Sequence, residues 1–255
     1  MFGLSREKGL VGLDIGSYSV KAVELRPKRK GDHATYELLK IGYEALPHDA
    51  IVEGTIIDSA AVVETIRQVF DEFKIANRDV GISISGNSVI IKKISLPRMT
   101  QEDLDESIQW EAEQYIPFDV KDVNIDTQIL TPAADAAGQM DVLLVAAKKD
   151  MINDYTSVCA EAGLTATVVD VDAFAVQNAF EANYDIGPGQ PVVLINVGAA
   201  VTNINVVVNG MATFTRDITM GGNAFTEEIQ KQLNISYEEA EALKVGGQGE
   251  ADAVV

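Results

Sequence analysis

One pattern of three short strands occurs twice in this sequence, and it restricts the fold more than any other feature. In each copy an apolar strand ends close to a glycine, a tight turn follows, and two further strands complete the unit. The first copy occupies 11–16, 20–25 and 34–43, and the second occupies 193–198, 202–208 and 212–218. Asp14 aligns with Asn196, and Gly16 with Gly198. The repetition predicts two homologous halves.

The turns of the two copies carry the residue types of a phosphate site. Small residues at a strand end leave backbone N–H groups accessible, and such groups can surround phosphate oxygens. Lys21 adds a positive charge, and Asp14 can hold hydrated Mg²⁺. Either hairpin alone is more simply interpreted as a turn with glycine where the backbone needs it. Because the hairpin is duplicated, we favour a clamp on a nucleotide triphosphate.

The segment between the two copies predicts alternating helices and strands. Apolar residues at helical spacing predict a helix from about Val62 to Ala76. Thr100 to Asp103 matches a capping box, so a second helix begins there and Pro117 ends it. We expect strands at 80–85, 89–94, 124–130, 140–146 and 165–171, and helices at 149–162 and 172–184. A small α/β unit therefore interrupts the first half between about Gly86 and Thr165.

Charge and composition exclude several functional classes. The net charge of −19 disfavours binding to nucleic acid or directly to an anionic membrane. Nothing in the sequence resembles a signal peptide or a spanning helix of about 20 apolar residues. The single cysteine, Cys159, cannot form an intrachain disulfide, and we expect it to pack in the core. These features predict a cytoplasmic protein.

Common catalytic motifs are absent from the sequence. It contains no P-loop, no G-x-G-x-x-G dinucleotide motif and no G-x-S-x-G nucleophile motif. The two histidines, His33 and His48, stand beside aspartates in polar segments, where solvated loop residues are the favoured interpretation.

Two surface features allow more than one interpretation. Trp110 lies opposite the apolar stripe of its helix, so it either packs on a neighbouring element or anchors a partner, and packing is favoured. The basic segment Arg26 to Lys30 is either a solvated loop, which is favoured, or a contact for an acidic partner or a lipid headgroup.

With these motifs in view, the chain resembles the actin/Hsp70/sugar-kinase superfamily and, within it, the FtsA-like PilM family of type IV pilus assembly proteins. Residues 12–21 are similar to the first phosphate motif of the superfamily. The string Glu111 to Phe118 is similar to a segment specific to the PilM branch. Residues 169–175 resemble the connecting-helix motif, and residues 221–226 and 240–244 resemble the beginning of the upper second lobe.

The resemblance implies two duplicated α/β lobes of the actin-like, ribonuclease H-like class. We expect the first lobe at 1–86, an inserted FtsA/PilM-type subdomain at 87–165, and the rest of the first lobe with its connecting helix at 166–190. The second lobe begins at 191 and is expected to be incomplete at 255.

The resemblance also implies that ATP and Mg²⁺ lie between the hairpins. Asp14 and Asn196 would face the hydrated metal, Lys21 would contact phosphate, and Asp172 would orient the attacking water. Glu241 and Lys244 would approach the ribose or base. Backbone N–H groups would come from the two turns, Gly16, Ser17, Tyr18 and Ser19 in the first and Gly198, Ala199, Ala200 and Val201 in the second. Because the family has aspartate where Asn196 stands, we expect weak Mg²⁺ affinity and, at most, slow ATP hydrolysis.

The partners are likewise implied by the resemblance. The inserted unit and the first lobe would form a groove for the N-terminal cytoplasmic tail of PilN, an inner-membrane protein. The candidate contacts are Trp110, Tyr115, Ile116, Pro117 and Phe118. Other inner-membrane and motor proteins of the pilus machine are further expected partners, with membrane contact only through them. A ring or another homo-oligomer is also compatible with the sequence.

Three alternatives stay open at this stage. Another FtsA-like or MreB-like assembly protein would share the hairpins and an inserted subdomain. A sugar or acetate kinase would need a substrate-binding acid in the cleft or second lobe, and no such residue is identifiable. A scaffold without nucleotide is the third alternative, because Asn196 supplies no charge.

Overall fold

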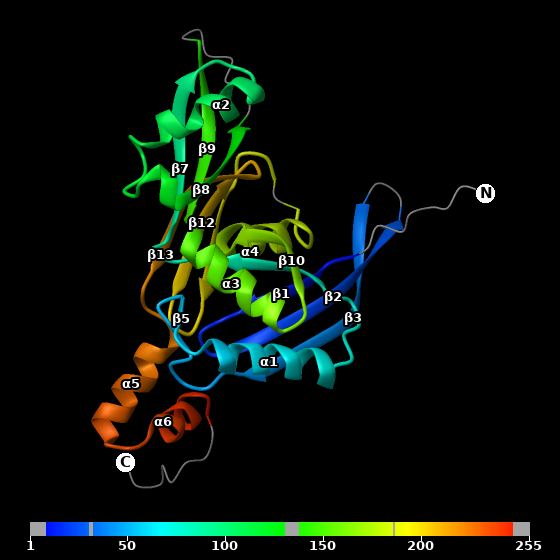
Figure 1. Ribbon diagram of the computed structural model, residues 1–255, viewed down its shortest axis with the longest axis vertical. Coiled ribbons are helices and arrows are strands. Elements are labelled where there is room, and N and C mark those ends of the chain that lie inside the picture. Colours follow the sequence, from blue (N-terminus) through cyan, green and yellow to red (C-terminus); the bar gives the residue numbers. More distant parts are fainter. Residues whose placement is uncertain (1–8, 31–32, 131–137, 186, 247–255) are drawn as a thin grey trace, which may run out of the picture.

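The computed structural model describes residues 9–30, 33–130, 138–185 and 187–246 (Figure 1). Its central element is a sheet in the strand order β10-β6-β1-β2-β3. The strands β1 (Val11–Ile15), β2 (Ser19–Lys30) and β3 (His33–Ala45) form the expected antiparallel meander, and β6 (Asp79–Ile84) and β10 (Thr165–Val171) run parallel to β1. A short hairpin, β4 (Ile51–Val52) and β5 (Thr55–Ile56), follows β3.

Two helices cover one face of this sheet and form the first hydrophobic core. They are α1 (Ser59–Glu72) and α3 (Lys149–Glu161), which pack against each other as well as on the strands. Asp58 caps α1 by accepting a hydrogen bond from the Ala61 N–H. Cys159 of α3 is buried, as predicted, and burial raises the pKa of its thiol to about 11.

The helix α1 is shorter than its apolar spacing predicts. It ends at Glu72 rather than near Ala76, because Lys74 adopts a left-handed backbone (φ 55°) and the Ile75 N–H turns back to the carbonyl of Phe70. Ile75 is nevertheless buried. The apolar residue after the helix therefore belongs to the core without belonging to the helix.

The inserted segment forms a second sheet with its own core. Its strands are β7 (Val89–Pro97), β8 (Val123–Leu130) and β9 (Gln139–Lys148), in the order β7-β9-β8. The helix α2 (Gln101–Ala112) packs on this sheet and begins with the predicted capping box between Thr100 and Asp103, and a short 3₁₀ turn, η1 (Val120–Asp122), precedes β8. The apolar stripe of α2 is buried as expected, with the members Leu104, Ile108 and Ala112.

The second meander follows the helix α4 (Asp172–Glu181), which connects the two halves. Its strands are β11 (Pro191–Val197), β12 (Thr202–Val208) and β13 (Met211–Ile218), all antiparallel. The helices α5 (Gly222–Leu233) and α6 (Tyr237–Lys244) come last and lie together at one end of the molecule (Figure 1). The order of strands and turns repeats that of β1, β2 and β3, so the predicted repeat of three strands is present in the structure.

The division into domains stays a proposal, and the two cores bear on where its boundaries lie. The strands of the insertion and α2 share one core, whereas α3 contributes Tyr155, Val158 and Cys159 to the core of the first lobe. This packing supports an end of the insertion nearer Lys148 than residue 165.

A glycine in β3 tests the packing of α1 on the first sheet. A methyl group added to buried Gly42 would lie 2.8 Å from Phe73 Cδ2 and 2.9 Å from Val69 Cγ1. We expect Gly42→Ala to lower the free energy of unfolding by about 1–3 kcal/mol through overpacking, as measured by urea denaturation. The matched control is Gly12→Ala in β1, where the nearest atom would be 3.8 Å away. An equal loss in both variants would contradict this account.

Candidate functional site

The two hairpin turns face the same cleft, which has a volume of about 650 Å³. In the first turn the Gly16 N–H donates to the Ser19 carbonyl, and in the second the Gly198 N–H donates to the Val201 carbonyl. The same backbone bond thus closes both turns. The cleft is lined by every residue that the sequence assigned to the nucleotide: Asp14, Gly16, Ser17, Tyr18, Ser19, Lys21, Asp172, Asn196, Gly198, Ala199, Ala200, Val201, Glu241 and Lys244. The structure therefore brings all of these residues together in one cleft.

Asp14 and Lys21 form an ion pair at the first turn. They lie directly opposite each other in the β1–β2 register, and Lys21 Nζ is 2.9 Å from Asp14 Oδ2. Their side chains are about half exposed, at 57% for Asp14 and 48% for Lys21, so both charges stay accessible from the cleft. An ammonium group and a carboxylate side by side suit a phosphate and its hydrated cation.

The equivalent pair in the second hairpin has no charge. Asn196 lies opposite Asn203 in the β11–β12 register, just as Asp14 lies opposite Lys21. The amide Nδ2 of Asn196 donates to Asn203 Oδ1 over 3.1 Å, and Asn203 Nδ2 donates to Asp217 Oδ1 over 2.8 Å. The sequence interpretation missed Asn203, although aligning the hairpins would have found it. It also missed Asp217, for which the hairpin alignment gives no signal.

Asp172 is the first residue of α4 and lines the cleft. Its carboxylate accepts a hydrogen bond from the Ser83 hydroxyl over 2.5 Å. Burial raises the pKa of Asp172, and the negative charges of Asp14 and Asp217 act in the same direction, against the lowering effect of hydrogen bonds from Ser83 and Ser85. A half-buried carboxylate of raised pKa in a cleft is a candidate for accepting a proton from a water molecule. No sequence pattern indicated the two serines.

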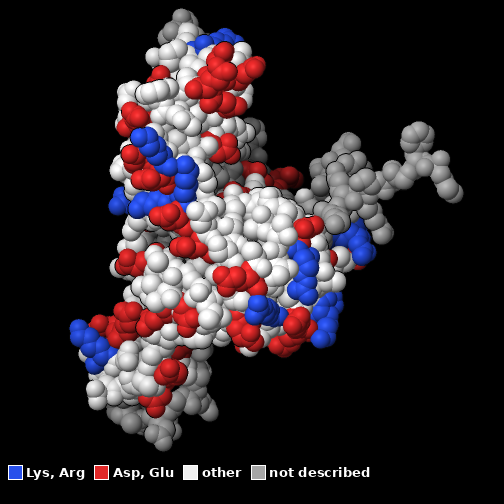
Figure 2. Space-filling model, in the orientation of Figure 1, with Lys and Arg blue, Asp and Glu red and all other residues white. Residues whose placement is uncertain are grey.

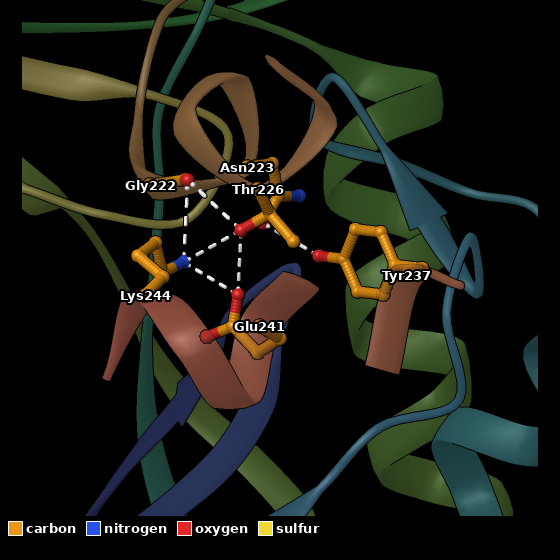
Figure 3. A network of polar contacts seen from close by, with 6 residues as sticks. All are labelled: Gly222, Asn223, Thr226, Tyr237, Glu241 and Lys244. Atoms are coloured by element: carbon orange, nitrogen blue, oxygen red, sulfur yellow. Dashed lines mark hydrogen bonds and ion pairs between the residues drawn. The ribbon is translucent and has the colours of Figure 1, made fainter. Parts of the chain in front are cut away.

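Glu241 and Lys244, which line the cleft, belong to a closed polar network between α5 and α6 (Figure 3). Lys244 Nζ is 2.5 Å from Glu241 Oε2 and donates to Thr226 Oγ1, which in turn donates to Glu241. Burial opposes the ionisation of Glu241, but hydrogen bonds from Lys244 and Thr226 outweigh it and lower the pKa of this carboxyl group. The network fixes α6 against α5, so both charged side chains hold one orientation beside the cleft.

The second turn is also in tight contact with the beginning of α5. The Gly222 and Asn223 N–H groups donate to the carbonyls of Gly198 and Ala199 over 2.9 and 2.8 Å. A methyl group on Gly221 would lie 2.4 Å from the Gly198 oxygen, so only glycine fits there. This contact places the helices of the second half directly on the second turn.

The five candidate partner residues do not share one environment. Trp110 is 77% exposed, so the favoured expectation that it packs on a neighbouring element is wrong within the part of the chain that the structure describes. The neighbouring elements cover the apolar stripe of α2 and leave its acidic face open. Ile116 is instead buried in the core of the insertion, and Tyr115 and Phe118 pack against that core.

The helix α2 ends before this segment. It stops at Ala112, and turn-type bonds from Tyr115 and Ile116 to the Ala112 carbonyl continue the chain to Pro117, rather than the helix that the sequence predicted. Lys92 donates to the Tyr115 carbonyl, and Lys148 lies over the Phe118 ring at 4.6 Å. The segment Tyr115 to Phe118 therefore supports the insertion, and Trp110 is its exposed neighbour.

The charges are unevenly distributed over the surface. Figure 2 shows acidic side chains over much of one face, including the region of α2, and basic side chains gathered beside the inserted sheet and near β2 and β3.

Within the described ranges, no cluster of three or more histidine, cysteine or acidic side chains could hold a metal ion. The same part of the chain has no helix long and apolar enough to span a membrane.

The basic segment Arg26 to Lys30 belongs to β2 and pairs with β3, so the favoured interpretation as a loop is wrong, and its own hairpin partly neutralises its charge. Lys28 and Arg26 lie 3.2 and 3.6 Å from the carboxylate of Glu37. In the loop after β3, Nδ1 of His48 lies 2.9 Å from Asp49 Oδ2, and its ring contacts Tyr237 of α6 at 3.9 Å between ring centroids. It is therefore a contact between the two halves rather than a free loop residue.

Comparison with known proteins relates this architecture to a family. The chain is similar to a solved "PilM-PilN type IV pilus biogenesis complex", with a TM-score of 0.82 and 28% identity, covering 93% of this chain and 69% of that chain. The ethanolamine utilization protein EutJ of Carboxydothermus hydrogenoformans has the fold in common, with a TM-score of 0.50 and 14% identity over 93% of this chain and 61% of that chain.

Curated sequences give a second line of comparison. The cell division protein FtsA of Bacillus subtilis (strain 168) is 26% identical over 260 residues, which are 92% of this chain and 57% of FtsA. The chain thus spans little more than half the length of the curated relatives that it matches. The fold is of the mixed α/β, actin-like ATPase class. A family profile described as "Type IV pilus assembly protein PilM" matches residues 12–252. The chain therefore belongs to the PilM family of type IV pilus assembly proteins, whose fold is FtsA-like.

Proposed function

We propose that this protein is an ATP-binding scaffold of the type IV pilus inner-membrane platform. In this role it binds the N-terminal cytoplasmic tail of PilN and connects the platform to its cytoplasmic motor. Membership of the PilM family supports the assignment to the pilus machine, and the similar solved structure is a complex with PilN. The observation that carries the nucleotide part is the single cleft lined by both hairpin turns.

The cleft fits a nucleotide triphosphate with a hydrated cation. Lys21 would contact phosphate, and Asp14 and Asn196, which face one cleft from opposite hairpins, would hold the water shell of Mg²⁺. When bound, the cation would neutralise phosphate charge. The backbone of the two turns would hold the phosphates, and the Glu241–Lys244 pair would meet the ribose or base.

The nucleotide acts mainly as a conformational ligand in this proposal. Asp172 could hold and orient a water molecule, but the second hairpin offers an amide pair where a carboxylate would supply charge. Any ATP hydrolysis would therefore be slow. Binding between two lobes instead favours the arrangement in which both turns reach the phosphates.

The tail of PilN is expected to lie in a groove where the inserted unit meets the first lobe. This groove, with a volume of about 690 Å³, is lined by residues of α2, β8 and η1 and by Lys149 at the start of α3. β8 is an edge strand of the described sheet, so an extended tail could add to it while its apolar side chains reach Ile108, Val123 and Ile125. Trp110 does not line this groove: it follows Gln109 of the groove wall and faces about 100° further round α2, where a tail that extends beyond the groove would contact it.

The proposed location is cytoplasmic, at the inner membrane through partners. The acidic surface disfavours direct contact with anionic lipid or with nucleic acid. Other inner-membrane and motor proteins of the pilus would use the remaining surface, and the protein could form a ring on the platform.

The first test is calorimetric titration of the full-length protein with a synthetic N-terminal PilN tail, with and without Mg-ATP. We expect binding, together with a change in the fluorescence of Trp110, the only tryptophan of this sequence. Trp110→Ala is expected to weaken the interaction without unfolding the protein, because the side chain is exposed. A tail that fails to bind in either condition would move the assignment to another actin-like assembly protein.

Lys21 tests the phosphate site. Lys21→Ala is expected to weaken Mg-ATP binding by about tenfold or more, because a charge-assisted hydrogen bond is lost. The matched control is Lys40→Ala, which removes an exposed lysine of β3 that lies outside the cleft. Binding is measured by calorimetry and by the rise in melting temperature with Mg-ATP. Equal affinity in the two variants would remove Lys21 from the site.

Asp172 gives a prediction that depends on pH. Because its pKa is raised, the Asp172 carboxyl group binds a proton more tightly in the folded protein than in the unfolded chain. The contribution of this group to the free energy of unfolding therefore falls as pH rises through the folded pKa. Asp172→Asn, which keeps an acceptor for Ser83, should melt at a higher temperature than wild type at pH 7.5, with the difference shrinking toward pH 4. Asp185→Asn, at an exposed loop carboxylate, serves as the control. If Asp172→Asn melted at a lower temperature than wild type at pH 7.5, ionised Asp172 would not destabilise the fold, and this prediction would be wrong.

A further inference from the structure

A chain of three hydrogen bonds runs from the nucleotide cleft to Gly86, the last residue before the inserted unit. It begins at Asn196, which lines the cleft, and passes through Asn203 to Asp217. The other carboxylate oxygen of Asp217 accepts the backbone N–H of Gly86 over 2.6 Å. Gly86 lies between β6 of the first lobe and β7 of the insertion, so the chain joins both halves of the molecule and the insertion.

The position of Gly86 makes this contact sensitive to movement of the insertion. Its backbone adopts a positive φ of 92°, which glycine tolerates readily, and its carbonyl accepts the Val89 N–H that begins β7. Gly86 is buried, so without Asp217 its N–H would lose the partner that the structure provides. Asp217 therefore holds the point at which the inserted unit leaves the first sheet.

The direction of every bond in the chain is fixed from the Asp217 end. A carboxylate only accepts, so Asn203 must direct its NH₂ group toward Asp217 and its oxygen toward Asn196. Position 196 must then donate, which asparagine does and an ionised aspartate cannot. This requirement gives a physical reason for the asparagine at the position where the family resemblance predicts aspartate. The oxygen of Asn196 takes no part in this bond, and Asn196 lines the cleft.

We propose that Asp217 is a positioning residue that couples the cleft to the inserted unit. The proposal rests on the proposed function and specifies its regulation. A ligand that engages the oxygen of Asn196 changes the geometry of the Asn196–Asn203 bond, and the buried amide of Asn203 transmits the change to Asp217. The hydrogen bond from the Gly86 N–H to Asp217 then changes its geometry, and this alters the orientation of the insertion and its groove. By thermodynamic reciprocity, a peptide in that groove changes nucleotide affinity by the same factor.

The test follows amide hydrogen exchange in the peptide covering residues 85–91 of the full-length protein, with and without saturating Mg-ATP. In the wild type we expect Mg-ATP to change exchange in this segment and to change the affinity of the PilN tail, with couplings of this kind typically about 5–150-fold. Asp217→Asn replaces one acceptor oxygen by an NH₂ group, which then faces a donor, either Asn203 Nδ2 or the Gly86 N–H. Asn203→Ala interrupts the chain at a different point and keeps the bond between Asp217 and Gly86.

Both variants are expected to lose the response of residues 85–91 to nucleotide, and to bind the tail equally with and without Mg-ATP. The control, Asp150→Asn, removes an exposed carboxylate of α3 and should respond like the wild type. A role of Asp217 in stability alone would lower the melting temperature of Asp217→Asn but leave the nucleotide response of this segment intact, which would overturn the proposal.

The outcomes separate this inference from the proposed function. A wild-type protein that Mg-ATP stabilises but whose exchange at 85–91 is unchanged would overturn the coupling and leave the scaffold function standing. The proposal would also be overturned if Asp217→Asn abolished the effect of Mg-ATP on exchange at 85–91 while Asn203→Ala retained it. Coupling between the cleft and Gly86 would then not depend on Asn203. A wild-type protein that binds neither Mg-ATP nor the tail would refute the proposed function and this inference with it.

Discussion

The backbone closure of two tight turns is the constraint on which the rest of the structure depends. Gly16 and Gly198 each donate an N–H to the carbonyl three residues ahead, and this bond sets the register of the strands on either side. The register in turn places Asp14 opposite Lys21 and Asn196 opposite Asn203. Because the same geometry occurs in both halves, two pairs of polar side chains face one cleft.

The two hairpins have diverged in charge while keeping the same geometry. The first has an exposed ion pair, whose charges are available to a ligand. The second has two amides, whose donors and acceptors are directed by Asp217. A charged pair contributes electrostatic attraction, whereas a chain of amides contributes orientation, since each member has one donor side and one acceptor side. In our proposal the first hairpin therefore binds phosphate, and the hydrogen bonds of the second hairpin change when the nucleotide is bound.

Contacts between segments distant in sequence concentrate around the cleft. Gly86 meets Asp217, Ser83 meets Asp172, and His48 meets Tyr237. Asp172 has a raised pKa because it is buried beside other carboxylates, a cost in stability that suits a functional site. The core of the insertion, in contrast, has its own apolar residues. Its sheet joins the first lobe at Gly86 and at the end of β9, where Ala147 is buried in the core of the first lobe. A separate core is compatible with movement of the insertion as a unit about these two connections.

The sequence by itself determined the duplicated meander, the capping box of α2, the buried stripes of the helices and the turn residues of the two hairpins, whereas Asp172, Glu241 and Lys244 were assigned only through the family resemblance. These follow from local rules, since strand alternation, helical spacing and turn chemistry are written in neighbouring residues. Only the tertiary structure decided that Trp110 is exposed, that α3 packs with the first lobe, and that Ser83 and Asp217 belong to the site. Periodicity identifies the apolar face of an element but not which element covers it. The partners of Asp172, Asn203 and Gly86 depend on how strands far apart in the chain are brought together, and no local pattern encodes that.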